Sequence, residues 1–306
     1  MKFLLLLLII FFFLSFFGDT HWTFDLLSHF RLHFFLAAFS LSLLALFLRR
    51  PYIFYPALIL CFVILVFSGP YWSSSQHIKE SSKSYNSLSL MTFNVWKDNE
   101  NFQPTLAYIR KTHPDIVGLI EVDHSMDQAL QSLRDLYPYY YSKPEEGRFG
   151  LALMSRHPFE VMDTSPYSFN EPVITVKLTT QSRSNPIHLV LLHPRPPINK
   201  AFTESRNDDF DTLSSWIQNL GDDPLIMMGD LNATRWSPSL SRLIKTNNLV
   251  GTQGIWSPGS WPSELGYFGI RIDHIFFKNF KGAPDLSVGP NLGSDHRPVN
   301  GKITWP

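Results

Sequence analysis

The segment MMGDLN, residues 227–232, places two polar side chains at the end of an apolar run. The run PLIMMG predicts a buried strand, and because side chains alternate along a strand, Asp230 and Asn232 point to the same face. A carboxylate can orient or deprotonate a water molecule, and an amide can donate a hydrogen bond to a phosphate oxygen. Asp and Asn are also common turn residues, so this segment alone leaves both interpretations open.

The same arrangement recurs along the second part of the chain, where apolar runs lie beside carboxylates, amides or imidazoles. These side chains are Asn94, Glu121, His193, Asp273 next to His274, and Asp295 next to His296. Because each lies beside a run with strand character, we expect them to meet with Asp230 in one shared site.

Oxygen ligands among these residues indicate a hard cation. Asn94, Glu121 and Asp295 offer oxygen, which suits Mg²⁺, or Mn²⁺ or Ca²⁺ in its place, better than zinc. Glu121 is the first choice as a ligand, because Asp123 or Ser125 can cap the helix that VDHSMDQAL predicts. Mg²⁺ keeps several waters and needs only one or two protein carboxylates, so the set predicts a magnesium site.

The chain from about residue 88 to residue 303 resembles the endonuclease/exonuclease/phosphatase superfamily, which includes DNase I and the neutral sphingomyelinases. The fragments that carry the resemblance are, in order, TFNVW, IVGLIEVD, GLALMSR, LLHPRPP, MMGDLNA, RIDHIFF and GSDHRPV. The resemblance implies a four-layer α/β/β/α sandwich, in which two packed and mostly antiparallel sheets lie between helices. By itself, the alternation of strand-like and amphipathic runs predicts only an α/β domain.

The resemblance also implies roles for the site residues and a reaction. It makes Glu121 a metal ligand, pairs Asp273 with His296, and puts Asp230 and Asn232 beside the scissile phosphate with His193 as a further donor. The reaction is in-line attack of water on a phosphodiester or phosphomonoester. Whether Asp230 or His296 activates the water stays open, because either pKa depends on burial and on partners.

One position departs from the pattern of the abasic-site endonucleases in this superfamily. Trp96 stands two residues after Asn94, where those enzymes carry an acidic residue. A second carboxylate near the metal is therefore missing. This departure weakens an assignment as a repair endonuclease, but not the resemblance to the superfamily.

Residues 1–72 have the composition of a membrane segment. Long Leu, Phe and Ile runs predict three transmembrane helices, at about residues 3–17, 32–48 and 52–72, and the first could instead be a cleaved signal. Arg49 and Arg50 lie between the second and third spans, and the positive-inside tendency puts that loop in the cytoplasm. Everything after Trp72 is then expected on the outer side.

The remainder divides into a polar, Ser-rich linker over residues 73–87 and one domain over residues 88–306. Removing the four cations and two anions of residues 1–72 from the totals of 26 each leaves 22 Lys and Arg and 24 Asp and Glu. That balance lacks the basic excess typical of proteins that bind DNA without sequence preference. A glycan at the Asn232-Ala233-Thr234 acceptor pattern would block a site residue, which favours a bacterial inner membrane, with the domain on the periplasmic side.

These observations favour a membrane-anchored, metal-dependent phosphoesterase that acts on a nucleic acid, a lipid headgroup or a small phosphodiester, with no obligate protein partner evident. An inactive membrane-tethered binding module of the same fold is the alternative. A serine hydrolase built on Ser294, Asp295 and His296 is disfavoured, because neighbouring strand residues point to opposite faces and no G-x-S-x-G motif exists.

Two further features have open interpretations. Arg206 could pair with phosphate, but it is interpreted as a solvated charge on an amphipathic helix, paired with a neighbouring acid such as Glu204 or Asp209. The aromatic side chains of the Gly-, Pro- and Trp-rich segment at residues 251–271 could stack on bases, contact lipid or pack beneath the segment itself.

Overall fold

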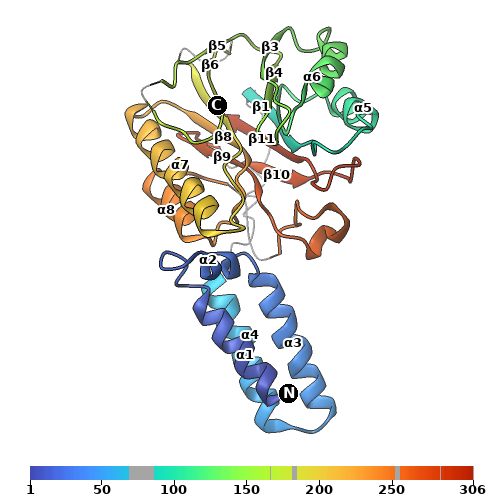
Figure 1. Cartoon of the computed structure of the whole chain (residues 1–306), viewed down its shortest axis with the longest axis vertical. Helices are drawn as coiled ribbons and strands as arrows, with labels where there is room; N and C mark the ends of the chain where they lie inside the picture. Colours follow the sequence, from blue (N-terminus) through green and yellow to red (C-terminus); the bar gives the residue numbers. More distant parts are fainter. Residues whose placement is uncertain (69–85, 166, 181–184, 252–255, 283, 306) are drawn as a thin grey trace.

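The computed structural model describes residues 1–68, 86–165, 167–180, 185–251, 256–282 and 284–305. A bundle of N-terminal helices projects from one end of a domain built on two sheets (Figure 1). The last residues of the third predicted span and most of the predicted linker lie outside the described residues.

The two sheets are mostly antiparallel, as the resemblance implies. The first has the order β10 (Asp285–Val288), β11 (Val299–Trp305), β1 (Asn86–Asn94), β2 (Ile116–Ile120), β4 (Leu151–Ser155) and β3 (Tyr139–Lys143). The second has the order β5 (Phe159–Val161), β6 (Val173–Leu178), β7 (Ile187–Leu192), β8 (Leu225–Asp230) and β9 (Asp273–Lys278). Among these described strands, the pairs β1/β2 and β7/β8 run parallel, and the other pairs run antiparallel.

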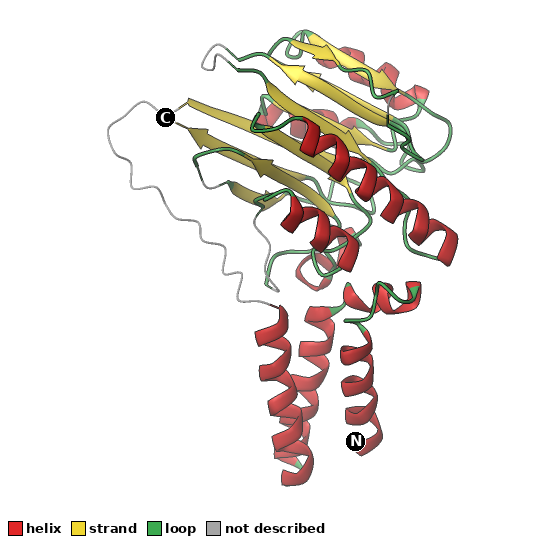
Figure 2. Ribbon diagram, turned by 90° about the vertical axis from the view of Figure 1, so that its left-hand side faces the viewer, coloured by secondary structure: helices red, strands yellow, loops and turns green. Residues whose placement is uncertain are grey.

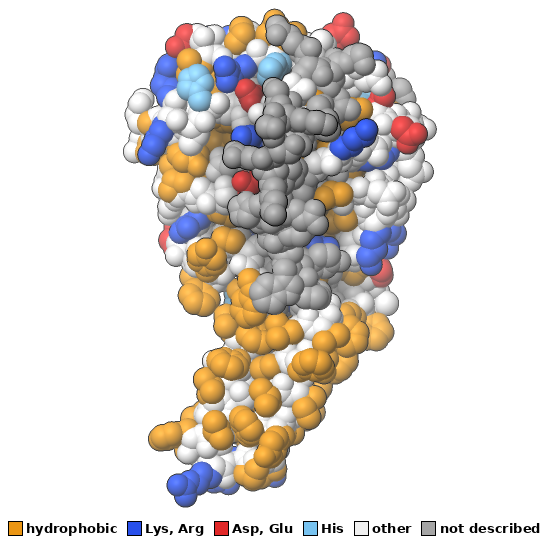
Figure 3. Space-filling model, turned by 180° about the vertical axis from the view of Figure 1, so that it is seen from behind, with side chains coloured by type: hydrophobic (Ala, Val, Ile, Leu, Met, Phe, Trp, Pro, Cys, Tyr) orange, Lys and Arg blue, Asp and Glu red, His pale blue; other side chains and the backbone are white. Residues whose placement is uncertain are grey.

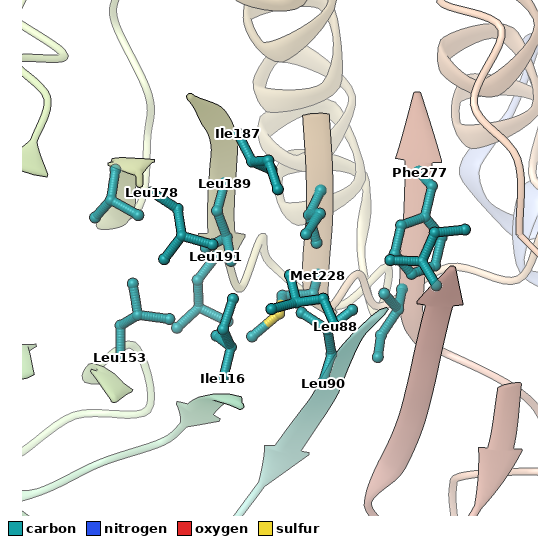
Figure 4. Packing of buried hydrophobic residues seen from close by; sticks show 14 of the residues in the cluster. Leu88, Leu90, Ile116, Leu153, Leu178, Ile187, Leu189, Leu191, Met228 and Phe277 are labelled. Atoms are coloured by element: carbon teal, nitrogen blue, oxygen red, sulfur yellow. The ribbon is translucent and has the colours of Figure 1, made fainter. Parts of the chain in front are cut away.

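The inner faces of the sheets form the main core (Figure 4). Leu90, Ile116 and Leu153 from the first sheet face Leu191 and Met228 from the second. Strands buried on both faces need continuous apolar runs, which is why IVGLI and LIMMG lack a polar alternation. At Gly118 the sheets meet so closely that an added Cβ would lie 2.2 Å from the Met228 Cε atom.

Helices cover the outer face of each sheet and complete four layers (Figure 2). The first sheet is covered by α5 (Gln103–Thr112) and α6 (His124–Leu130), and the second by α7 (Lys200–Asn219) and α8 (Pro238–Thr246). The apolar face of α7 buries Phe210, Leu213 and Trp216 against the second sheet. The expected two-sheet α/β sandwich is therefore confirmed.

The projecting bundle contains α1 (Lys2–Leu14), α2 (Trp22–Ser28), α3 (Arg31–Phe47) and α4 (Pro51–Ser68). Among the described helices, α4 alone is long and apolar enough to cross a bilayer, and α2 with α3 meets the same test across a 67° bend. The 13-residue α1 is shorter. By length and composition the described helices thus supply one span, or two if the bent pair counts as one span, and the three predicted spans stay a prediction.

Apolar side chains cover the outside of the bundle. On α4, Tyr55, Ile59 and Phe62 are each more than 60% exposed. Figure 3 shows this apolar surface along the bundle, with Lys and Arg side chains at its far end. A continuous exposed apolar surface of this kind marks a contact with lipid or with another protein.

Candidate active site

The sheet register brings most of the predicted site residues to one edge of the domain. Since β7 and β8 run parallel with Leu192 opposite Gly229, the next residues, His193 and Asp230, are neighbours. In the antiparallel pair β8/β9, Asp230 lies directly opposite Asp273. In the other sheet Asn94 pairs with Ile120, so that Glu121 follows beside it.

Two site residues have backbone angles that side chains rarely adopt. Glu121 has a φ of 60° and Asn232 a φ of 47°. Non-glycine residues in the left-handed region cost free energy and cluster at functional sites. Glu121 directly follows β2 and Asn232 lies two residues after the end of β8, where this conformation turns the chain sharply, and Glu121 is buried.

Asp230 is the centre of the cluster. Its Oδ2 atom lies 3.5 Å from the Nε2 atom of His193 and 3.6 Å from that of His296. The side-chain amide of Asn94 donates to the same oxygen at 3.1 Å, and the backbone N–H of Asn232 donates to Oδ1 at 2.9 Å. Burial alone would raise the pKa of Asp230, but the charges of His296 and His193 outweigh it and hold the pKa below its usual range.

Asp273 holds the imidazole of His296 in a fixed orientation. Its Oδ2 atom lies 2.8 Å from the Nδ1 atom of His296, which leaves Nε2 facing Asp230. The hydroxyl of Ser260 accepts the backbone N–H of Asp273, which anchors the backbone that carries this carboxylate. Burial would lower the pKa of His296, but the carboxylates of Asp273 and Asp230 outweigh it and raise that pKa to about 10.

Neighbouring His274 has a different role from His296. It is fully buried, and its Nε2 atom donates to the carbonyl oxygen of Ala233 at 2.7 Å. Burial lowers the pKa of His274 to about 3, so this imidazole stays neutral. The hydrogen bond from His274 therefore holds the backbone of the segment that follows Asp230 in place, while His296 faces the cluster.

The carboxylates beside this cluster fit a divalent cation. Glu121 accepts hydrogen bonds from the side chain of Asn94 at 3.1 Å and from the backbone N–H of Lys97 at 3.0 Å. Asp295 accepts the indole N–H of Trp261 with Oδ2, whereas its buried Oδ1 has no hydrogen-bond partner among the described residues. Burial, and to a smaller extent the charges of Glu121 and Asp230, raise the pKa of Asp295.

A second arrangement of ligands is geometrically available. Asp230, Asp273 and His296 offer ligand atoms within 4.8 Å of one another. However, the Nδ1 atom of His296 already bonds Asp273, and its Nε2 atom faces Asp230, so these three are organised to handle protons. The described residues thus offer a cation two sets of ligand atoms, these three residues and the pair of carboxylates Glu121 and Asp295.

Two predicted residues are placed differently from the expectation. The amide nitrogen of Asn94 faces the carboxylates, and its oxygen accepts the backbone N–H of Trp96, so Asn94 bridges Glu121 and Asp230 instead of presenting oxygen. The amide of Asn232 donates to the carbonyl of Pro194 at 2.9 Å and is not aimed at the centre of the cluster.

Arg148 is a further site residue that the sequence analysis missed. Its guanidinium lies 3.2 Å from Glu121 and 2.7 Å from Asp98, and its side chain is half exposed. Its backbone carbonyl accepts the Nδ1–H of His193 at 2.9 Å, which turns Nε2 of His193 towards Asp230. The segment EEGRFG has no periodic pattern, so nothing in the sequence marked this residue.

The interpretation of Arg206 as a solvated charge is wrong. Its side chain is fully buried and pairs with Asp25 of α2 at 2.6 Å. It also donates to the backbone carbonyl of Asn232 at 3.2 Å. The acids predicted as its partner, Glu204 and Asp209, lie on the same helix, whereas the acid that pairs with it lies in the N-terminal bundle.

The geometry of Ser294 argues further against a serine hydrolase. Its hydroxyl donates to the backbone carbonyl of Asn94 at 2.7 Å and accepts the backbone N–H of His296 at 3.0 Å. The first bond joins the loop before β11 to the end of β1, and the second lies within that loop. The hydroxyl thus has a structural role and is not activated by an imidazole.

Comparison with known proteins agrees with this geometry. The sequence profile of the Endonuclease/Exonuclease/phosphatase family matches residues 91–296. No curated protein sequence matches the chain.

Several solved structures share the fold at low identity. Truncated TDP2 from Caenorhabditis elegans has a TM-score of 0.57 at 14% identity, covering 71% of this chain and 97% of that one. TDP2 from D. rerio, complexed with a single-strand DNA product, has a TM-score of 0.57 at 16% identity, covering 71% and 98%. A family protein from Bacteroides thetaiotaomicron has a TM-score of 0.53 at 15% identity, covering 73% and 100%. With the family profile spanning most of the domain, this chain belongs to the Endonuclease/Exonuclease/phosphatase family.

Proposed function

We propose that this protein is a membrane-anchored phosphoesterase that depends on a divalent cation and hydrolyses a phosphate ester by in-line attack of water. The observation that carries the proposal is the position of Asp230, whose Oδ2 atom lies within 3.6 Å of two imidazole nitrogens. A buried carboxylate flanked by two imidazoles can hold a water molecule and move its proton. The adjacent carboxylates supply the negative charge that a cation needs.

Each residue of the cluster has a part in this reaction. Asp230 and His296 together orient the attacking water and hold its proton, with Asp273 fixing the imidazole. His193 donates to a phosphoryl oxygen from the other side of Asp230. Glu121 and Asp295 would hold Mg²⁺, or Mn²⁺ or Ca²⁺ in its place, and the bound cation stabilises charge on the phosphoryl group.

The distribution of cations along the bundle supports membrane anchoring with the domain on the outer side. Arg49 and Arg50 join α3 to α4 at the end far from the domain, and Lys2 lies near Tyr52 at the same end. An end rich in Lys and Arg stays in the cytoplasm under the positive-inside rule. The domain at the opposite end would then face the periplasm, across a bacterial inner membrane.

A nucleic acid is the second candidate substrate. The D. rerio TDP2 structure that shares this fold holds a single-strand DNA product. Against this candidate, residues 73–306 carry 22 Lys and Arg against 24 Asp and Glu. A nuclease without sequence preference usually presents a basic surface to its substrate.

The proposal is tested with the full chain in detergent micelles. Bis(4-nitrophenyl) phosphate and 4-nitrophenyl phosphate are offered with Mg²⁺ or with EDTA, and nitrophenol release is measured. We expect release with Mg²⁺ and none with EDTA, with the preferred compound separating diesterase from monoesterase activity. If the folded protein hydrolyses neither compound, and its melting temperature does not change when Mg²⁺ is added, it is instead the inactive binding module.

A further inference from the structure

We propose that residues 256–268 form a membrane-contacting surface that seats the active site on the bilayer, and that the substrate is the phosphate ester of a lipid headgroup. This inference rests on the proposed function and names the substrate class of the same site.

Large apolar side chains are exposed on this segment. Trp256 is 49% exposed, Leu265 51%, Tyr267 67% and Phe268 60%. The last three belong to the short 3-10 segment η2 (Ser263–Phe268), which buries only Ser263. Exposed aromatic and aliphatic side chains gathered on one loop, with both Trp and Tyr among them, are typical of a membrane interface.

This apolar surface is continuous with the helical bundle. The Nε2 atom of His33 donates to the carbonyl oxygen of Phe268 at 2.8 Å, and the rings of Phe35 and Trp256 make an edge contact at 5.2 Å. His33 and Phe35 lie in the first turns of α3, at the end of the bundle nearest the domain (Figure 1). A bilayer that surrounds the bundle would therefore reach residues 256–268 at its surface, which identifies lipid as the occupant.

The same segment contacts two aspartates of the site, Asp295 through its carboxylate and Asp273 through its backbone. Trp261 donates its indole N–H to Asp295 at 3.1 Å, and Ser263 donates its backbone N–H to the Asp295 carbonyl at 2.7 Å. Ser260 anchors the backbone of Asp273. Only a few residues therefore separate the exposed apolar side chains from the residues of the site.

On its other side, the site also abuts the bundle. The indole N–H of Trp236, in the segment after Asp230, donates to the carbonyl of Ser68 at the end of α4. Arg206 links the carbonyl of Asn232 to Asp25 of α2. Because both segments that flank the site meet the domain end of the bundle, the site lies at the level of the lipid headgroups.

Charge balance separates a lipid from a nucleic acid as substrate. A headgroup phosphate is already concentrated at the bilayer surface, so a protein fixed there needs no basic track to collect it. A polynucleotide would need such a track, and the near-neutral balance of residues 73–306 does not supply one. The observations therefore favour a lipid.

Contact with lipid is tested on the full chain in vesicles of phosphatidylethanolamine, phosphatidylglycerol and phosphatidic acid. Cys61, the one cysteine, is replaced by Ser, and a fluorescent NBD label is placed through Leu265→Cys or, as the control, Val161→Cys on β5, which is 46% exposed. We expect nitroxide-labelled lipids to quench the label at position 265 at least threefold more than at position 161. Equal quenching at the two positions would overturn the membrane contact.

The substrate is tested by headgroup or phosphate release from the same vesicles, with bis(4-nitrophenyl) phosphate as the soluble reference. We expect the triple variant Leu265→Ser, Tyr267→Ser, Phe268→Ser to lower vesicle turnover at least tenfold relative to turnover of the soluble ester. An unchanged ratio, or wild-type protein that cleaves a single-stranded oligonucleotide but no vesicle lipid, would overturn the lipid assignment. If the wild type does not hydrolyse the soluble ester, the proposed function itself is wrong. The quenching experiment still tests the membrane contact in that case, because it does not depend on activity.

Discussion

Two buried polar clusters lie at the same end of the domain, and they differ in how their charges are paired. In the junction cluster (Asp25, His29, Arg206, Thr234 and Ser237), Asp25 accepts from Arg206 at 2.6 Å with one oxygen and from Ser237 at 2.7 Å with the other. In the proposed catalytic cluster (Glu121, His193, Asp230, Asp273, Asp295 and His296), called the catalytic cluster below, the Oδ1 atoms of Asp273 and Asp295 are buried without a hydrogen-bond partner among the described residues.

This difference separates a structural contact from a site that binds something. Buried acceptors are normally satisfied, so these carboxylate oxygens can accept a cation or a water molecule, whereas both oxygens of Asp25 in the junction cluster already have partners. Both oxygens of Asp25 are bonded inside the protein, and the guanidinium of Arg206 supplies its counter-ion there. Residue type alone does not make this distinction, because both clusters contain Asp and His.

The largest expected effect is on the catalytic cluster. Asp230→Asn removes the charge between the two imidazoles, so we expect kcat on a soluble phosphodiester to fall about 10³-fold, within the usual range for loss of a general base. The control is Asp223→Asn, which changes a half-exposed aspartate paired with His188 at the other end of β7. Loss of activity in the control, or normal activity in Asp230→Asn, would contradict the assignment of Asp230.

A comparable free-energy change is expected in the junction cluster, but in stability. Asp25→Ala leaves the guanidinium of Arg206 buried without its anion, which costs about 3–5 kcal/mol of unfolding free energy. Denaturant unfolding of the full chain in micelles measures the loss.

A double variant tests whether the junction is only structural. Asp25→Leu with Arg206→Met replaces the ion pair with apolar side chains, which in other proteins is often neutral for stability. We expect the double variant to recover at least half of the stability that Asp25→Ala loses, and to keep metal-dependent turnover. If turnover disappears while stability recovers, the junction cluster takes part in catalysis and the comparison fails.

Removal of the cation is expected to lower the unfolding free energy by less than Asp25→Ala does. This loss should depend on residues of the catalytic cluster alone. Mg²⁺ at about 100 times its Kd should stabilise the folded protein by about 2.7 kcal/mol, because it binds the native state alone. Glu121→Gln should abolish this rise in melting temperature, whereas Glu160→Gln, an exposed glutamate on β5, should leave it unchanged. A full Mg²⁺-dependent shift in Glu121→Gln would remove Glu121 from the ligand set.

The convergence of the site could be predicted from sequence because its residues lie at the ends of apolar strands. Asn94, Glu121, His193 and Asp230 each end or directly follow a run that the hydrophobic pattern marks clearly. Strand ends on one edge of a sheet must meet, so local pattern and global fold agree here. Asp123 also caps α6 as expected, with its side chain accepting the backbone N–H of Met126 at 2.7 Å.

Elements with weak patterns were missed. The strand β5 has three residues, β3 is a partly exposed run of tyrosines, and β10 is a short edge strand. The helix α8 has nine residues and buries Ser239 along with two leucines, so its apolar stripe is narrow. Such short elements are stabilised by tertiary packing, which a local pattern does not contain.

The junction could not be found from sequence for a different reason. Arg206 and Asp25 are separated by 181 residues, and Asp25 lies in a stretch whose composition indicates a membrane segment. Likewise Arg148 reaches Glu121 from a loop without periodicity. Whether two charges far apart in the sequence pair depends on how the folded elements that carry them pack together. Such a pair cannot be predicted from the local sequence of either element alone.

The smallest expected effect concerns a second ion pair between the bundle and the domain, and it tests whether burial makes the junction cluster important. Arg242 of α8 lies 3.2 Å from Asp19, and both side chains are at least half exposed. Because water screens such a pair, Arg242→Ala should change the unfolding free energy by less than about 1 kcal/mol. The measurement is the same denaturant series as for Asp25→Ala. A loss as large as that of Asp25→Ala would show that any charge between bundle and domain matters equally, and that the pairing inside the junction cluster has no special role.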